Sequence, residues 1–229
     1  MEGTFPVTAI RSSNGIIVTH LHAKAPKTVF MESVLQALKR QSKCVRDTIG
    51  CIIIDRQLLT ELKVRWHEGL FLTSATDGGL GEDIGSWSYL IFFGDDERPI
   101  IKGYSAETSS FDTMQSTREE LLGMLAVEFV MMVLAQVWGV PRIKVEMRLI
   151  SDSKSAIKSC NDEGKIPIGV KGVTRPDMEL KMELKTREEE SCWLSREVEW
   201  TKSHVDDRGE PSYETIINQM ADDLATMGR

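Results

Sequence analysis

The chain has 229 residues, of which 41% are hydrophobic and 28% are charged, and its formal net charge is −7. This length and composition are typical of a globular protein that buries a normal core. No uninterrupted apolar run approaches the ~18 residues of a transmembrane helix, so we expect no membrane partner. The first 30 residues lack a signal-peptide pattern, and the four cysteines have no metal-ligand spacing. We therefore predict an intracellular protein, cytoplasmic or nuclear, with reduced thiols.

The charge is unevenly spread along the chain. Residues 1–68 carry ten Lys and Arg against six Asp and Glu, whereas residues 69–229 carry 18 against 29. The acidic excess argues against a protein that binds nucleic acid by bulk positive charge. It raises the question of whether a few carboxylates converge in the second part.

Residues 1–68 contain no functional motif. A helix is predicted over residues 28–40 from the spacing of its apolar residues, and a buried strand over residues 51–54. A short strand over residues 15–18 and either a helical turn or a strand over residues 58–66 complete this part. We divide the chain into two parts. Residues 1–68 form a segment of unknown role, for which one interpretation is the remnant of a preceding polyprotein domain, and residues 69–229 form the second domain.

The pattern is sharper from residue 70 onward. Strands are predicted over residues 70–76, 86–93, 100–106, 143–150 and 197–202. Helices are predicted over residues 113–138, 154–160, 178–190 and 213–227. This order indicates an α/β fold, with a mixed sheet and helices on its faces.

Acidic residues occupy the positions where such a sheet builds a site. Asp77 and Asp152 follow the first and fourth strands of this part, and active sites of open sheets lie outside the carboxyl ends of strands. Glu120 lies in the first turns of the long helix, and Asp222 lies on the last helix. A cluster of such carboxylates needs hard divalent cations. Two ions ~3.5–4 Å apart can activate a water and stabilise the leaving oxygen of a phosphodiester.

Taken singly, these residues have simpler interpretations. An Asp-Gly-Gly sequence is usually a turn, and an Asp-Ser sequence is usually a helix cap. Glu119 and Asp223 are as acidic as their neighbours, so the choices between Glu119 and Glu120, and between Asp222 and Asp223, stay open at this point.

Five segments in order resemble the ribonuclease H family, over roughly residues 70–227. They are Thr76-Asp77-Gly78-Gly79, Arg118-Glu119-Glu120-Leu121, Ser151-Asp152-Ser153, Trp200-Thr201-Lys202-Ser203-His204 and Asn218-Gln219-Met220-Ala221-Asp222-Asp223-Leu224-Ala225. The region from His204 to Asp222 looks like the ribonuclease H domains of retrotransposon reverse-transcriptase polyproteins. Ser203 departs from the family, which often has Gly there, and we expect this change to stiffen the loop.

The resemblance implies a ribonuclease-H-like fold, with a five-stranded mixed sheet flanked by helices. It implies a metal-dependent endonuclease that hydrolyses the RNA strand of RNA/DNA hybrids by a two-metal mechanism. The implied cofactors are two Mg²⁺ ions, which Mn²⁺ can replace. The implied metal ligands, which are also catalytic, are Asp77, Glu120, Asp152 and Asp222.

The resemblance also implies roles around the metal ligands. His204 matches a catalytic histidine that assists proton transfer or product release. Gly78, Thr117 and Ser153 match substrate-binding positions near the hybrid backbone. No basic helix is evident over residues 162–193, so hybrid binding would depend on a reverse-transcriptase domain of the same polyprotein, on the basic N-terminal part or on a second chain.

Two other functions remain as alternatives. The chain could be a non-catalytic module of ribonuclease H fold that only bridges partners, or a DNA-cutting integrase or resolvase. The full set of four carboxylates argues against the first alternative, and His204 with the Asn218–Asp222 pattern argues against the second.

Overall fold

The computed structural model describes residues 18–19, 29–66, 68–81, 84–108, 116–139, 145–161, 178–191, 195–202 and 211–228. Its strands are β1 (Val18–Thr19), β2 (Cys51–Ile54), β3 (Leu70–Leu80), β4 (Ile84–Phe93), β5 (Ile101–Thr108), β6 (Val145–Ser151) and β7 (Ser195–Trp200). Its helices are α1 (Val29–Arg40), α2 (Lys43–Ile49), α3 (Arg56–Arg65), α4 (Ser116–Trp138), α5 (Lys154–Asn161), α6 (Met178–Ser191) and α7 (Tyr213–Met227).

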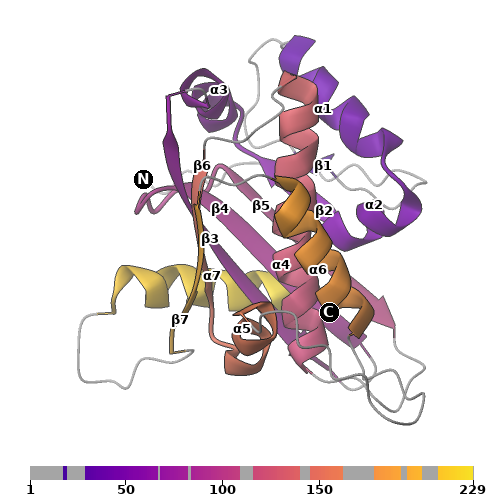
Figure 1. The fold of residues 1–229 in the computed structure, drawn as a ribbon, viewed down its shortest axis with the longest axis vertical. Coiled ribbons are helices and arrows are strands. Elements are labelled where there is room, and N and C mark those ends of the chain that lie inside the picture. Colours follow the sequence, from indigo (N-terminus) through magenta and orange to yellow (C-terminus); the bar gives the residue numbers. More distant parts are fainter. Residues whose placement is uncertain are drawn as a thin grey trace, which may run out of the picture.

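The strands form one mixed sheet in the order β1-β2-β5-β4-β3-β6-β7 (Figure 1). Strands β3, β4 and β5 pair antiparallel, whereas β6 pairs parallel with β3 and β7 pairs parallel with β6. The mixed sheet with flanking helices is therefore confirmed. Parallel β3 and β6 place the carboxyl ends of both strands at the same edge of the sheet.

The five strands predicted over residues 69–229 are β3 to β7, and two strands from residues 1–68 extend the same sheet to seven. Strand β2 pairs antiparallel with β5, and β1 pairs parallel with β2. The apolar run of β2 thereby covers the edge of β5, whose backbone groups would otherwise lack partners.

The described part of residues 1–68 shares the main hydrophobic core. Side chains of α1 and α3, such as Val34, Leu59 and Leu62, are buried in the same cluster as the apolar residues of α4. The segment predicted as a helical turn or a strand over residues 58–66 is the helix α3, which Asp55 caps by accepting hydrogen bonds from Gln57 N and Leu58 N. The role proposed for residues 1–68 as the remnant of a preceding domain stays a prediction.

Helix α4 crosses one face of the sheet and is buried along most of its length. The sequence led us to expect no helix that could span a membrane. By length and composition alone, however, α4 is long and apolar enough to do so, even though it contains Glu128 and Gln136. However, 72% of its apolar window is buried inside the protein. This burial is what the core helix of a sheet-and-helix domain requires.

An ion pair lies inside the core between α4 and β7. Arg196 Nε is 3.1 Å from Glu128 Oε1, and the two side chains are 4% and 1% exposed. Two buried charges of opposite sign compensate each other at this position, where either one alone would be costly.

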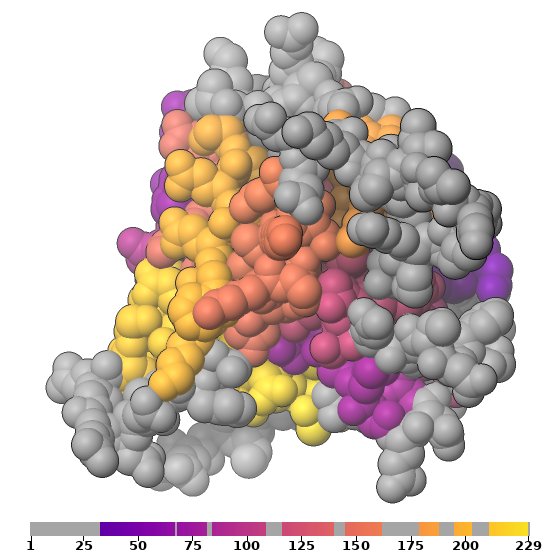
Figure 2. All heavy atoms as spheres, turned by 60° about the horizontal axis from the view of Figure 1, so that its bottom comes forward, coloured from indigo at the N-terminus to yellow at the C-terminus, as the bar shows by residue number. Residues whose placement is uncertain are grey.

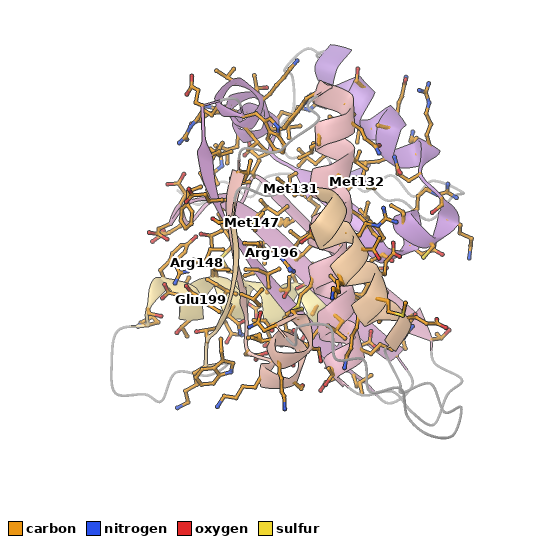
Figure 3. The ribbon with its side chains drawn as sticks, viewed as in Figure 1. Met131, Met132, Met147, Arg148, Arg196 and Glu199 are labelled. Atoms are coloured by element: carbon orange, nitrogen blue, oxygen red, sulfur yellow. The ribbon has the colours of Figure 1, made fainter. Side chains whose placement is uncertain are left out.

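Helix α7 covers the opposite face of the sheet. It buries Ile217, Ala221 and Leu224 in a second cluster against β3, β4 and β6. Its first turn is tied to the sheet by Arg148 of β6, which lies beside Glu199 of β7 (Figure 3). The guanidinium donates to Glu199 at 2.7 and 2.9 Å and to Glu214 at 2.8 Å.

Candidate metal centre and active site

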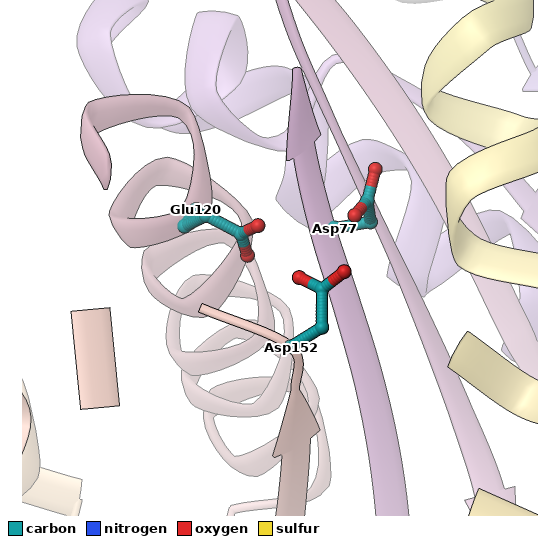
Figure 4. A group of neighbouring side chains, drawn as sticks. All are labelled: Asp77, Glu120 and Asp152. Atoms are coloured by element: carbon teal, nitrogen blue, oxygen red, sulfur yellow. The ribbon is translucent and has the colours of Figure 1, made fainter. Parts of the chain in front are cut away.

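Three carboxylates meet at the edge of the sheet where β3 and β6 run side by side (Figure 4). Asp77 comes from β3, Asp152 follows β6 directly, and Glu120 lies in the second turn of α4. One oxygen of each side chain lies within 4.8 Å of one oxygen of the others. Three elements far apart in the sequence thus present hard oxygen ligands to one point.

Gly78 lets α4 approach β3 closely enough to bring Glu120 to Asp77. A Cβ atom at Gly78 would lie 2.3 Å from the backbone nitrogen of Glu120 and 2.4 Å from the backbone carbon of Glu119. No side chain can occupy this space without moving the first turns of α4. The Asp-Gly-Gly segment is consequently part of a strand packed under a helix and not a turn.

Ser151 is the buried residue that holds the cluster together. Its hydroxyl donates to Glu120 Oε2 at 3.1 Å and accepts from the backbone N–H of Ser153 at 3.1 Å. Its carbonyl accepts from the N–H of Thr201 at 3.0 Å. One side chain therefore fixes both the glutamate and the chain that carries Asp152.

Ser153, and not Asp152, caps the helix that follows. Ser153 Oγ accepts from Ala156 N at 3.2 Å in the first turn of α5. Asp152 is held instead through its backbone, since Trp200 Nε1 donates to its carbonyl at 2.9 Å. This leaves the Asp152 carboxylate to face the other two acids.

Burial and the two neighbouring aspartates disfavour the ionised form of Glu120. Burial raises the pKa of Glu120 well above its ordinary value, and the charges of Asp77 and Asp152 raise it further. The hydrogen bonds from Ser151 and from the backbone of Gly78 lower that pKa only in part. Buried like charges of this kind are stabilised by a proton or a bound cation. The oxygen-only donor set fits a hard divalent cation such as Mg²⁺ or Mn²⁺.

The neighbouring glutamate points elsewhere. Glu119 is fully buried, and a Cβ atom at Gly85 of β4 would lie 2.2 Å from its Oε1. Its carboxylate therefore packs on the backbone of β4, and the structure groups Glu120 with the two aspartates.

The order of strands β3 to β7 and helices α4 to α7, with Asp77 on β3, Glu120 on α4 and Asp152 just after β6, matches the expectation drawn from the sequence, except that β3 continues to Leu80 and does not end before Asp77. The chain therefore has the mixed sheet flanked by helices that the resemblance to ribonuclease H implies. No protein-family model matches the chain, and no curated protein matches it significantly.

Among solved structures, the chain is similar to several ribonuclease H domains. One is the N-terminal RNase H domain of a Mycobacterium tuberculosis protein, solved as a fusion with maltose-binding protein, with 17% identity, a TM-score of 0.46 and coverage of 69% of this chain and 93% of that one. Another is RNase H1 of the halophilic archaeon Halobacterium salinarum, with 14% identity, a TM-score of 0.44 and coverage of 69% and 96%. A third is a foamy viral protease-reverse transcriptase in complex with RNA/DNA hybrid, with 12% identity, a TM-score of 0.47 and coverage of 70% and 20%.

The predicted fourth ligand, Asp222, is not grouped with the three converging acids. Asp222 is half-buried on α7 and is not one of the three residues whose oxygens converge. Gln219 Nε2 donates to both Asp222 and Asp223, at 3.2 and 3.1 Å. One residue before Asp222, the carbonyl of Ala221 accepts from Ser88, the cross-strand partner of Asp77. The ligand role of Asp222, and its choice over Asp223, stay predictions.

The structure describes three of the four remaining predicted residues, Gly78, Thr117 and Ser153. Thr117 lies one turn before Glu120, and its hydroxyl is 2.8 Å from that of Ser155 on α5. Gly78 and Ser153 have the packing and capping contacts given above, so their substrate-binding roles stay predictions. His204 lies outside the described residues.

Sequence reasoning assigned no role to Ser151 or Trp200, although both belong to the segments that carry the resemblance. A polar residue between apolar Ile150 and the candidate ligand Asp152 was the available signal for Ser151. The pairing of Trp200 with the Asp152 carbonyl depends on the register of β7 against β6, which the sequence does not display.

Proposed function

We propose that the chain is a metal-dependent endonuclease that hydrolyses the RNA strand of RNA/DNA hybrids. The convergence of Asp77, Glu120 and Asp152 within 4.8 Å carries this proposal. The site lies where the parallel pairing of β3 with β6 ends, just beyond the carboxyl end of β6, and open sheets place their active sites at this edge. The resemblance of five ordered sequence segments to ribonuclease H supports the hybrid as substrate.

In this proposal, each residue of the site has a distinct role. Asp77, Glu120 and Asp152, joined by Asp222, would hold two Mg²⁺ ions, for which Mn²⁺ could substitute. Bound ions of this kind supply an activated water and stabilise the developing charge on the leaving 3′ oxygen. Ser151 orients Glu120, and we assign His204 to proton transfer or product release.

The origin and setting of the chain are part of the same proposal. The segment from His204 to Asp222 supports a retroelement polyprotein as the source, with a reverse-transcriptase domain as a partner. We further propose that the protein acts inside the cell, in the cytoplasm or the nucleus.

The test is cleavage of an RNA/DNA hybrid with a labelled RNA strand, in Mg²⁺ and in Mn²⁺. Single-stranded RNA and duplex DNA are run in parallel. Asp77→Asn removes a charge from the site, and Asp96→Asn makes the same change at an exposed residue of the β4–β5 turn. We expect cutting of the hybrid alone, lost in Asp77→Asn and kept in Asp96→Asn. A folded protein that binds metal and hybrid but cuts nothing would favour the non-catalytic module.

A further inference from the structure

Trp200 and Lys154 form an exposed pair at the edge of the site. Trp200 ends β7 and remains 47% exposed, which is unusual for so large an aromatic side chain. Lys154 opens α5, and its Nζ lies 4.2 Å from the centroid of the indole ring. The negative face of the ring attracts the ammonium and restricts the freedom of the long lysine side chain.

This pair is coupled to the acidic cluster through backbone hydrogen bonds. The indole N–H donates to the carbonyl of Asp152, and the next residue, Thr201, donates to the carbonyl of Ser151. Because Asp152 belongs to the cluster, the ring and the ammonium are positioned relative to the candidate metal ligands. Figure 2 shows the face on which residues of α5 lie beside those of β7.

The charge at this edge is opposite to that of the cluster. The first turn of α5 contains no acidic residue, and Lys158 follows Lys154 by one turn on the same helix. Lys202 is exposed just beyond the end of β7. A polyanion that approaches three carboxylates is repelled by them, and cations beside the site offset that repulsion.

We propose that Lys154, held on the ring of Trp200, binds a backbone phosphate of the strand that is cut. This inference rests on the proposed function. Lysine contacts to phosphates position nucleic acids without reading their sequence.

The test measures the affinity of the full chain for a fluorescent RNA/DNA hybrid over a series of salt concentrations. Ca²⁺ replaces Mg²⁺, and a gel verifies that the hybrid stays intact. Lys154→Gln removes the charge and keeps most of the stem. Lys63→Gln makes the same change on α3, at the opposite end of the molecule from α5 in Figure 1.

The loss of one phosphate contact lowers the salt slope of the binding constant by about 1 and weakens binding about three- to tenfold at 0.1 M salt. We expect this loss for Lys154→Gln and unchanged binding for Lys63→Gln. Lys154→Arg keeps the charge and should bind within about twofold of the unmodified chain. Trp200→Leu should weaken binding in the unmodified chain and add little in the Lys154→Gln background, because the ring acts through the lysine.

Each outcome bears on the inference. Unchanged affinity and salt slope for Lys154→Gln, with hybrid cleavage intact in the unmodified chain, would refute the inference and leave the proposed function standing. If the double variant loses as much binding free energy as Lys154→Gln and Trp200→Leu lose together, the ring does not act through Lys154, and its proposed role in holding the lysine is refuted. An unmodified chain that neither binds nor cuts the hybrid would refute the proposed function and this inference together.

Discussion

Replacing Ser151 by alanine tests how the candidate site is held in place. The Ser151 side chain is fully buried, and its hydroxyl bridges Glu120 Oε2 and the backbone N–H of Ser153, at 3.1 Å each. Ser151→Ala leaves the buried Glu120 carboxyl and the half-buried N–H of Ser153 without this partner. A hydrogen bond to a charged group contributes about 1.5–3 kcal/mol. Loss of a group that orients a metal ligand typically lowers metal affinity or activity about 10–100-fold, which corresponds to about 1.4–2.7 kcal/mol. This range agrees with the energy of the hydrogen bond that Ser151→Ala removes.

The assay is titration of the protein with Mn²⁺, followed by calorimetry and by the rate of hybrid cleavage. We expect Ser151→Ala to raise the metal concentration at half-saturation about 10–100-fold and Ser151→Thr, which keeps the hydroxyl, to stay near the unmodified protein. Ser74→Ala is the matched control. Ser74 is equally buried on β3, and its hydroxyl has no hydrogen-bond partner among the described residues. Equal metal affinity in Ser151→Ala and Ser74→Ala, with both proteins folded, would refute the reasoning.

Three further predictions follow from packing and charge. Gly78→Ala should lower the free energy of unfolding by about 1–3 kcal/mol and reduce hybrid cleavage, because its Cβ would lie 2.3 Å from the backbone of α4; thermal unfolding that matches the unmodified protein would contradict this. Arg196→Met should cost about 3–5 kcal/mol, because it leaves Glu128 charged and buried, and the double variant Glu128→Leu/Arg196→Met should recover most of that loss in denaturant unfolding. The pKa of Glu214 is lowered by a hydrogen bond to its own backbone and by Arg148, so its contribution to stability is present above the ordinary pKa of 4.5 and is lost as the pH falls through the lowered value. The difference in melting temperature between the unmodified protein and Glu214→Gln should shrink at acid pH, and a difference that grows there would refute this assignment.

The sequence predicted the structure best in two places: where apolar residues recur at helical spacing, and where acidic residues follow a predicted strand. The apolar spacing of residues 113–138 predicted the long helix, which begins at Ser116, and the polar residues that follow residues 70–76 and 143–150 predicted where two carboxylates would meet. The outcome for Asp77 and Asp152 follows from parallel pairing of β3 with β6, a pairing that βαβ connections favour.

Other features depend on contacts that a linear pattern does not display. Glu120, and not Glu119, converges with the two aspartates, because the Glu119 carboxylate packs on Gly85. The pairing of β2 with β5 joins segments about 50 residues apart, and only the apolar character of residues 51–54 hinted at it. Nothing in the sequence distinguishes Arg196 from other strand residues. In the structure its positive charge compensates the buried negative charge of Glu128 on α4.

The most direct measurement of the central claim is an analysis of the products formed from an RNA/DNA hybrid, with each strand labelled in turn. The account predicts cutting of the RNA strand alone, in Mg²⁺ or Mn²⁺ and not in chelator, that leaves 3′-hydroxyl and 5′-phosphate ends and disappears in Asp152→Asn. Cutting that persists in chelator or in Asp152→Asn, or that leaves cyclic phosphate ends, would contradict a metal-dependent centre built from Asp77, Glu120 and Asp152.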